Sequence, residues 1–110
     1  MKIWVDDVRP APADYAVAKS VNEAIATIEL AESFGVYFPS SGETRRVTIE
    51  LIDIDHDAGD YAHDGGDYIK LLDWLEETGR NYPIRIHSMN PVGRQNMLAI
   101  CQKNNWKVVY

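Results

Sequence analysis

The sequence predicts an α/β fold, namely a small doubly wound parallel sheet of five strands with helices on both faces, in a three-layer α/β/α arrangement. Short apolar runs alternate along the chain with segments of helical periodicity, and this alternation is typical of parallel sheets. Right-handed crossovers then restrict the topology to a doubly wound sheet. The 110 residues suffice for one core, so we expect a single domain over residues 1–110.

The first part of the chain holds two expected strands and the start of a helix. Lys2–Val5 is rich in residues that favour extended structure, and Pro10 and Pro12 then require a loop. Tyr15–Ala18 is a second strand candidate, although its connection to the first is shorter than the dozen or more residues usual for parallel crossovers. Ser20 opens a helix, because the run Ser-Val-Asn-Glu has the form of a capping box.

Apolar residues at helical spacing continue this helix until Gly35, which can supply the left-handed stop. They are Val21, Ala24, Ile25, Ile28 and Ala31. Residues 39–42, Pro-Ser-Ser-Gly, predict a turn, and Glu43–Arg46 a charged surface segment. The apolar run Val47–Ile54 is then long enough for a central strand that is buried on both faces.

The second half of the chain repeats the alternation of strands and helices. A polar loop at Gly59–Gly66 precedes a helix expected over about residues 67–78. Ile84–Ile86 is the next strand. Asn90 caps a third helix, since asparagine is favoured before a helix and proline is tolerated at its first position. Trp106–Tyr110 is expected to form the last strand.

Composition and charge exclude several classes of function. The formal net charge is −6, whereas broad binding to nucleic acid needs a basic face, so we expect no binding of duplex DNA. No stretch approaches the roughly 18 apolar residues of a membrane span, and the first residues show no signal-peptide pattern. The single cysteine, Cys101, rules out an internal disulfide framework. We therefore expect a cytoplasmic protein without membrane contact, whose charge still permits a nucleotide-sized substrate.

Acidic residues follow the first and central strands, where ligands bind in open parallel sheets. Asp53, Asp55 and Asp57 alternate, so an extended chain would place all three on one side, and like charges ~4 Å apart repel by about 4 kcal/mol at a protein-like dielectric. A divalent cation would relieve this repulsion, and carboxylates favour Mg²⁺, Mn²⁺ or Ca²⁺. The preferred ligands are Asp6, Asp7 and Asp55, with Mg²⁺ or Mn²⁺ as the expected ion. The alternative for the adjacent pair is one carboxylate that caps a loop and one that faces solvent.

Two histidines stand at strand ends and are candidates for acid–base catalysis. An imidazole at His56 or His87 can exchange a proton near neutral pH. Asp57, which follows His56, belongs to the same catalytic group. The alternative is that each histidine is a hydrogen-bonded structural residue.

A third cluster follows the strand at Ile84–Ile86 and is suited to an anion. Ser88 ends this strand, and Asn90 opens a helix whose free N–H groups can bind phosphate. Arg94, in the first helical turn, could supply a bidentate phosphate contact, and Arg9 is a second cationic candidate. Acidic metal ligands, imidazoles and phosphate donors together indicate phosphoryl chemistry.

The arrangement resembles the receiver (flavodoxin-like) fold of two-component signalling. In receivers an acidic pair follows the first strand, an aspartate ends the third and a hydroxyl residue ends the fourth. The corresponding residues here are Asp6 with Asp7, Asp55 and Ser88. Receivers also place a lysine at the end of the fifth strand. Here Lys107 lies at the start of the last strand instead, which counts against phosphate-accepting signalling.

The chain more closely resembles the cyclic-phosphate processing receiver-like family. The hallmarks of this family look like D-D-x-R-x-x-P, L-D-H-D-x-G and H-S-x-N-P-x-G-R-x-N-M. The corresponding stretches here are residues 6–12 (DDVRPAP), 54–59 (IDHDAG) and 87–97 (HSMNPVGRQNM). Asp53 departs from the small polar residue expected at its position, and its charge is unexplained. The resemblance implies a role on cyclic phosphates of nucleotides or RNA ends.

The sequence therefore predicts a metal-dependent phosphoesterase that acts on a cyclic nucleotide or a cyclic RNA end. Two alternatives stay open. The first is a non-enzymatic receiver-like module for signalling or for binding a phosphorylated ligand. The second is an acidic strand rim that holds only a structural cation.

Overall fold

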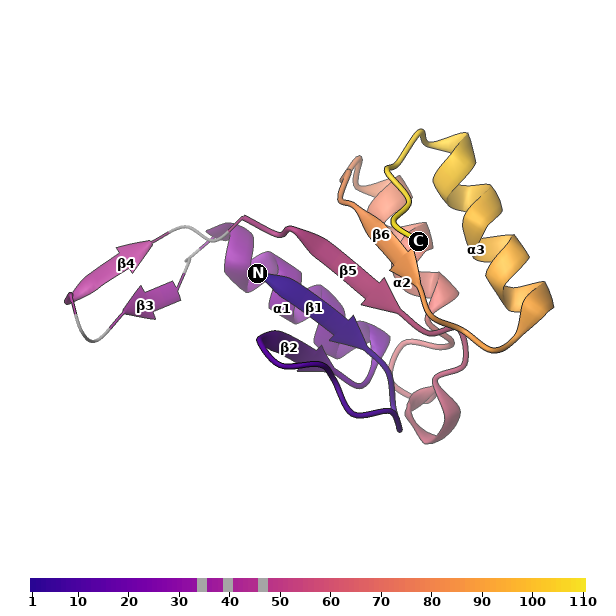
Figure 1. The fold of residues 1–110 in the computed structure, drawn as a ribbon, viewed down its shortest axis with the longest axis horizontal. Helices are drawn as coiled ribbons and strands as arrows, with labels where there is room; N and C mark the ends of the chain where they lie inside the picture. The colour runs from indigo at the N-terminus through magenta and orange to yellow at the C-terminus, as the bar shows by residue number, and fades with distance from the viewer. Residues whose placement is uncertain (34–35, 39–40, 46–47) are drawn as a thin grey trace.

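The main sheet has four parallel strands. The computed structural model describes residues 1–33, 36–38, 41–45 and 48–110. Within these residues the strands lie in the order β2-β1-β5-β6 (Figure 1). Their bounds are Lys2–Val5 for β1, Tyr15–Ala18 for β2, Leu51–Ile54 for β5 and Ile84–Ile86 for β6. The predicted α/β class and parallel sheet are confirmed, and β2 pairs in parallel with β1 in spite of its short connection.

Three helices cover the sheet, and two of them begin at the predicted caps. They are α1 (Val21–Ser33), α2 (Ile69–Glu77) and α3 (Pro91–Lys103), with a short 3-10 helix, η1, at Gly59–Tyr61. The Ser20 hydroxyl accepts a hydrogen bond from the Glu23 N–H at 3.0 Å, which is one half of the predicted capping box. The Asn90 side chain likewise accepts from the Gly93 N–H at 3.0 Å.

The three-layer arrangement is not confirmed. Helix α2 packs against both α1 and α3, and Figure 1 shows α1 and α2 behind the sheet, on the same face. In the part of the chain that the structure describes, the connection from β1 to β2 contains no helix. The connections from β2 through α1 to β5 and from β5 through α2 to β6 advance in the same direction across the sheet, and right-handed crossovers therefore place these helices on one side.

The core lies between the sheet and this helix layer. Alternate strand residues point into it and are fully buried, among them Ile3, Val5, Ile52 and Ile84. The intervening residues form the opposite face, where the register aligns Val17, Trp4, Asp53 and Arg85. This second face carries a buried charge, and it adjoins the site described below.

The expected fifth strand is reduced to a single bridge. Among the described residues, the segment Trp106–Tyr110 pairs with β6 at one bridge, between Val108 and Ile84. The Ile84 N–H donates to the Lys107 carbonyl, and the Val109 N–H donates to the Ile84 carbonyl. Because β6 has only three residues, its outer edge offers few backbone groups for further pairing. The predicted five-stranded sheet is thus a four-stranded sheet with one added bridge.

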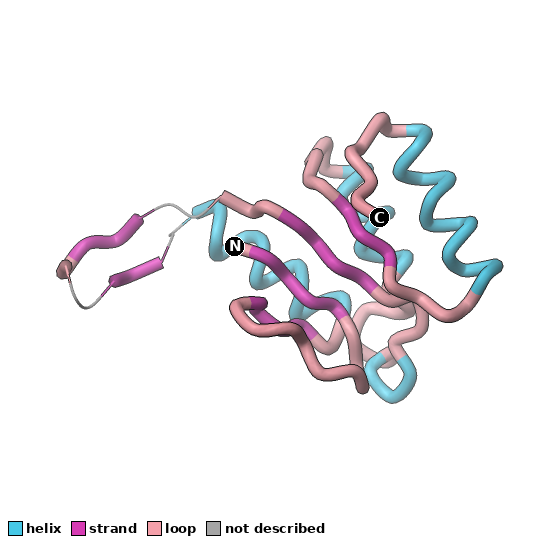
Figure 2. The backbone as a smooth tube through the Cα atoms, in the orientation of Figure 1, coloured by secondary structure: helices cyan, strands magenta, loops and turns pink. Residues whose placement is uncertain are grey.

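The middle of the chain also differs from expectation. The charged segment predicted from Glu43 forms strand β4 (Glu43–Arg45), which pairs antiparallel with β3 (Val36–Phe38) apart from the main sheet (Figure 2). Valine, tyrosine and phenylalanine favour such a strand. The central strand begins at Leu51, later than predicted. The expected features at Gly35, Pro39, Ser40, Arg46 and Val47 lie outside the described residues.

Candidate functional site at the carboxyl end of the sheet

The strand register brings polar residues into a row at the carboxyl end of the sheet. Val5, Ala18, Ile54 and Ile86 end their strands, and the structure pairs Val5 with Ala18 and Ile54, and Ile54 with Ile86. Asp6 follows Val5, Lys19 follows Ala18, Asp55 follows Ile54 and His87 follows Ile86. The predicted convergence of strand-end side chains is therefore present, and Lys19 is an additional cation on the rim that the sequence analysis did not consider.

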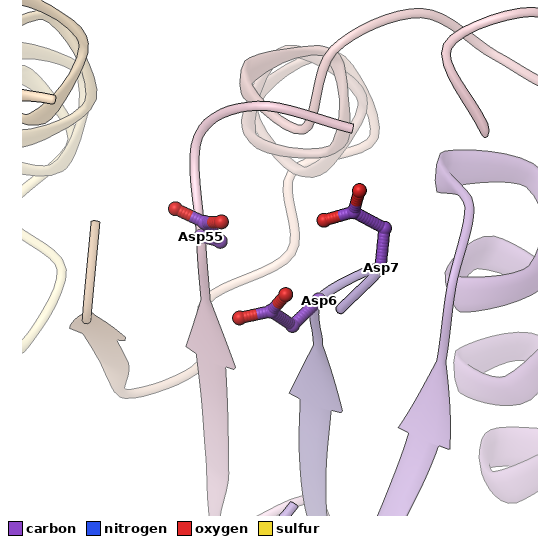
Figure 3. A group of neighbouring side chains, drawn as sticks. All are labelled: Asp6, Asp7 and Asp55. Atoms are coloured by element: carbon purple, nitrogen blue, oxygen red, sulfur yellow. The ribbon is translucent and has the colours of Figure 1, made fainter. Parts of the chain in front are cut away.

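Asp6, Asp7 and Asp55, which we call the acidic trio, converge at this rim (Figure 3). One carboxylate oxygen from each lies within 4.8 Å of the others. Asp6 and Asp55 are buried, and Asp7 is half-buried. Burial raises the pKa of Asp7, and the charges of its two neighbours raise it further. The chain thus holds three carboxylates together despite their mutual repulsion.

Gly59 allows the chain to pass close to the trio. Its φ of +55° lies in the left-handed region, and a Cβ there would come within 2.4 Å of Asp7 Oδ2. A larger residue would displace the Asp7 carboxylate. The glycine of the 54–59 motif therefore shapes the acidic site itself.

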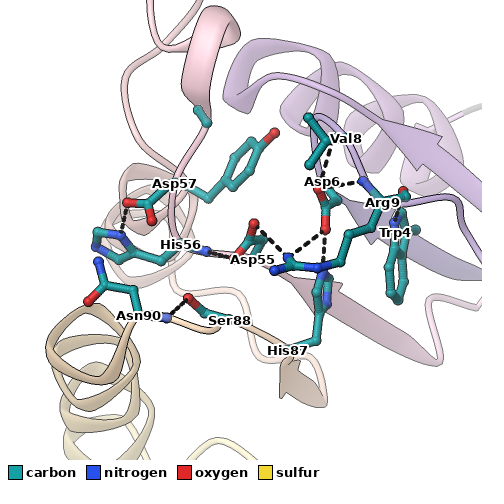
Figure 4. Close-up of polar contacts among 12 residues, drawn as sticks. Trp4, Asp6, Val8, Arg9, Asp55, His56, Asp57, His87, Ser88 and Asn90 are labelled. Atoms are coloured by element: carbon teal, nitrogen blue, oxygen red, sulfur yellow. Dashed lines mark hydrogen bonds and ion pairs between the residues drawn. The ribbon is translucent and has the colours of Figure 1, made fainter.

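The Arg9 guanidinium lies between two members of the trio (Figure 4). Its NH1 is 3.2 Å from Asp6 Oδ2 and 3.0 Å from Asp55 Oδ2. The hydrogen bond to Asp6 and the charges of both carboxylates raise the pKa of Arg9. Burial opposes ionisation of Asp6, but the Val8 and Arg9 N–H groups, His87 and the guanidinium together hold its pKa below the usual range. The residue predicted as a phosphate ligand is here a counter-ion of the trio.

His87 lies between two buried carboxylates. Its Nε2 is 2.8 Å from Asp6 Oδ2, and its Nδ1 is 2.7 Å from Asp53 Oδ1. The Trp4 ring stacks on the imidazole with centroids 4.0 Å apart. Burial would lower the pKa of His87, but the hydrogen bonds to Asp53 and Asp6 outweigh burial and raise it. Both ring nitrogens are therefore engaged, and the surroundings favour the imidazolium.

Asp53 is the residue whose charge the sequence left unexplained. It is fully buried on the face of the sheet without helices, where it contacts His87 and, at 3.4 Å, the Arg85 NH1. Its charge is thus compensated by an imidazole and a guanidinium. The sequence signal was a carboxylate inside an apolar strand, since buried charges are almost always paired. What the sequence could not supply was the partner on the neighbouring strand.

The His56 and Asp57 side chains form a pair of their own (Figure 4). His56 Nδ1 is 2.8 Å from Asp57 Oδ1, and in the described part of the chain no hydrogen bond engages Nε2. The imidazole packs against the first turn of α3, where a Cβ on Gly93 would lie 2.4 Å from the ring. The His56 N–H donates to Asp55 Oδ1 at 2.8 Å, which connects this pair to the trio through the backbone.

The predicted phosphate ligands of the third cluster lie near the start of α3, and their hydrogen bonds stay within their own segment. The Ser88 hydroxyl accepts from the Asn90 N–H at 3.1 Å, and Asn90 caps the helix. Arg94 donates to the carbonyl of Ile86, at the end of β6. Within the described residues no hydrogen bond joins these three side chains to the acidic trio.

Comparison with known families agrees with this geometry. The cyclic-phosphate processing receiver domain family matches residues 1–103. The chain belongs to this family. No curated protein and no solved structure matches it significantly. As a cyclic-phosphate processing receiver domain, the chain has the receiver-like parallel sheet with its acidic rim. None of the helices that the structure describes has the length and apolar composition to cross a bilayer.

Proposed function

We propose that this receiver domain is a metal-dependent phosphoesterase that opens cyclic phosphates of nucleotides or RNA ends. The observation that carries the proposal is the convergence of three carboxylates at the rim of the sheet, in a chain of the cyclic-phosphate processing family. The rim also carries imidazoles and cationic side chains. Carboxylates, acid–base groups and anion ligands are the components that phosphoryl chemistry requires.

The donor set suits Mg²⁺ or Mn²⁺. Asp6, Asp7 and Asp55 offer only carboxylate oxygens, which hard divalent cations prefer, and the trio includes no thiolate or imidazole that would favour zinc. These three residues would hold the ion. When bound, it would supply Lewis acidity to a phosphoryl oxygen and activate water for attack on phosphorus.

The two histidines take different roles in this proposal. In opening a cyclic phosphate, water adds to phosphorus, one ester P–O bond breaks, and the leaving ribose oxygen takes a proton. His56 suits this proton exchange, because Asp57 fixes Nδ1 while Nε2 is free of hydrogen bonds in the described residues. His87 holds Asp6 and Asp53 through both nitrogens, so we assign it to positioning.

The remaining cations and donors would orient the phosphate. Arg9 and Arg94 offer guanidinium groups at the carboxyl ends of β1 and β6. Ser88 and Asn90 lie beside the N-terminus of α3, where backbone N–H groups favour anions.

Turnover of defined cyclic phosphates tests the proposal. Purified protein with Mg²⁺ or Mn²⁺ is expected to open a 2′,3′-cyclic nucleotide, a 3′,5′-cyclic nucleotide or a cyclic-ended RNA, with products separated by chromatography. Asp7→Asn is the matched variant, because Asp7 forms no ion pair among the described residues and its loss should leave the fold intact. We expect its turnover to fall by about a hundredfold. Absence of turnover with every substrate and metal would contradict the proposal.

One observation favours a second function, a non-enzymatic module that binds a phosphorylated ligand. Arg9 compensates part of the charge of the trio and places a guanidinium at the rim, where it could bind a phosphorylated ligand. This module would show thermal stabilisation by the phosphorylated ligand without any product. Product formation excludes it.

A further inference from the structure

The Arg9 guanidinium contacts two of the three carboxylates that are proposed to hold a divalent cation. A single guanidinium nitrogen lies within 3.2 Å of Asp6 Oδ2 and 3.0 Å of Asp55 Oδ2. Both carboxylates belong to the acidic trio. Both oxygens of Asp6 and of Asp55 already accept hydrogen bonds, so a cation held by the trio would compete with the guanidinium for these carboxylates.

We propose that Arg9 is an internal counter-ion which a divalent cation displaces from Asp6 and Asp55, and that the released guanidinium then binds the substrate phosphate. The inference rests on the proposed metal-dependent function. It adds an order to that function, in which the cation binds first and prepares the anion site. The protein thereby presents a free arginine to phosphate only when the acidic trio is filled.

The charges of the site favour this exchange. Three carboxylates with Arg9 carry a formal charge of −2, and the same carboxylates with a divalent cation carry −1. Asp7 gains most, because it forms no ion pair among the described residues and has a carboxylate oxygen within 4.8 Å of one from Asp6 and one from Asp55. Replacing one positive charge by two therefore relieves a repulsion that Arg9 leaves in place.

The Arg9 side chain can leave the trio while its backbone stays fixed. Asp6 Oδ1 accepts hydrogen bonds from the N–H groups of Val8 and Arg9 at 3.0 and 3.1 Å. The Trp4 indole N–H donates to the Arg9 carbonyl at 3.0 Å. Because the side chain is already 39% exposed, its guanidinium can turn toward solvent without opening the core. The anchored backbone keeps it at the rim.

Substitution of Arg9 shows whether its guanidinium competes with the cation for the acidic trio or only stabilises the trio. Arg9→Met keeps much of the side-chain stem and removes the charge, and the backbone anchors on Asp6 do not depend on the side chain. Arg85→Met is the matched control, since this arginine pairs with Asp53 and with no member of the trio. Calorimetric titration of each metal-free protein with Mn²⁺ gives the affinity directly, and circular dichroism verifies folding. Arg9→Gln carries the same test if Arg9→Met does not fold.

We expect Arg9→Met to bind Mn²⁺ about tenfold more tightly than the wild type, a difference of about 1.4 kcal/mol. Arg85→Met should bind as the wild type does. Equal or weaker binding by Arg9→Met, with measurable binding by the wild type, would overturn the role of Arg9 and leave the metal site standing. If no protein binds Mn²⁺ or Mg²⁺, the proposed metal site fails and the inference fails with it.

Inorganic phosphate tests the release of the guanidinium. Saturating Mn²⁺ should increase the affinity of the wild type for phosphate, and this increase should be about tenfold smaller in Arg9→Met, again about 1.4 kcal/mol. Arg85→Met should retain the full increase. The same increase in Arg9→Met as in the wild type would show that the released arginine does not bind the anion.

Discussion

Replacing Asp53 by alanine tests whether the buried pair with His87 stabilises the rim of the sheet. Asp53 is fully buried, and its Oδ1 lies 2.7 Å from the Nδ1 of an imidazole that is only 11% exposed. Removing one partner of a buried pair leaves the other without compensation, at a cost of about 3–5 kcal/mol. We therefore expect Asp53→Ala to lower the free energy of unfolding by about 3 kcal/mol or more, a large part of the stability of an ordinary domain.

Two matched variants separate the charge from its surroundings. Asp53→Asn retains the shape and a carbonyl that can accept from Nδ1, so it should cost about 1–2 kcal/mol, the difference between charged and neutral hydrogen bonds. Arg85→Met removes the guanidinium whose NH1 lies 3.4 Å from Asp53 Oδ2, and the Arg85 side chain is 46% exposed. Exposed pairs contribute little, and this variant should change stability by less than about 1 kcal/mol.

Urea unfolding of the metal-free proteins, followed by circular dichroism at about pH 6, measures these differences, because an ordinary histidine is largely charged there. The expected order of cost is Asp53→Ala, then Asp53→Asn, then Arg85→Met. If Asp53→Ala costs no more than Arg85→Met at an unchanged m value, the imidazole does not stabilise the buried carboxylate, and the argument for the network is wrong.

Three further predictions concern neighbouring parts of the structure. Since the pKa of His87 is raised, its contribution to stability is complete below about pH 6.5 and is lost as pH rises through the raised value. Urea titrations of the wild type should show this loss, and those of His87→Gln should not. Gly93→Ala would place a Cβ 2.4 Å from the His56 ring and displace the imidazole, and cyclic-phosphate turnover should fall by about a hundredfold in a variant that circular dichroism shows to be folded. Unchanged turnover would exclude His56 from proton exchange. Ser20→Ala removes the cap of α1 and should cost about 1 kcal/mol of unfolding free energy, whereas an unchanged urea midpoint would count against the cap.

Much of the fold could be predicted from local signals. Capping residues at Ser20 and Asn90 and the apolar runs of β1 and β6 indicated the elements, because each signal depends on neighbours in sequence. The number of strands and layers depends on pairing between distant segments. Thus the extent to which Trp106–Tyr110 would pair with β6 could not be judged from its apolar residues alone.

The acidic trio was predictable for a related reason. Parallel strands place their carboxyl ends on one edge, so residues after β1 and β5 must meet there. Which side chains then pair depends on register and burial. From the sequence we expected Asp53 to be repelled by Asp55, whereas in the structure it pairs with His87. The sequence likewise predicted Arg9 as a phosphate ligand, whereas in the structure its guanidinium contacts two carboxylates.

The contacts of Asp55 bear on whether this receiver domain transfers phosphate to itself. Asp55 Oδ1 accepts the His56 N–H at 2.8 Å, and Oδ2 contacts Arg9 at 3.0 Å, so each oxygen already has a partner. Asp55 is also buried, which restricts the approach of a phosphoryl donor to its carboxylate. Arg9 and Lys19 come from the β1 and β2 side of the sheet, and Arg94 comes from α3, so none of these three cations belongs to the segment after α3. If the proposed cation displaced Arg9, Asp55 would remain engaged, so these contacts favour its proposed role as an ion ligand over a role as a phosphate acceptor.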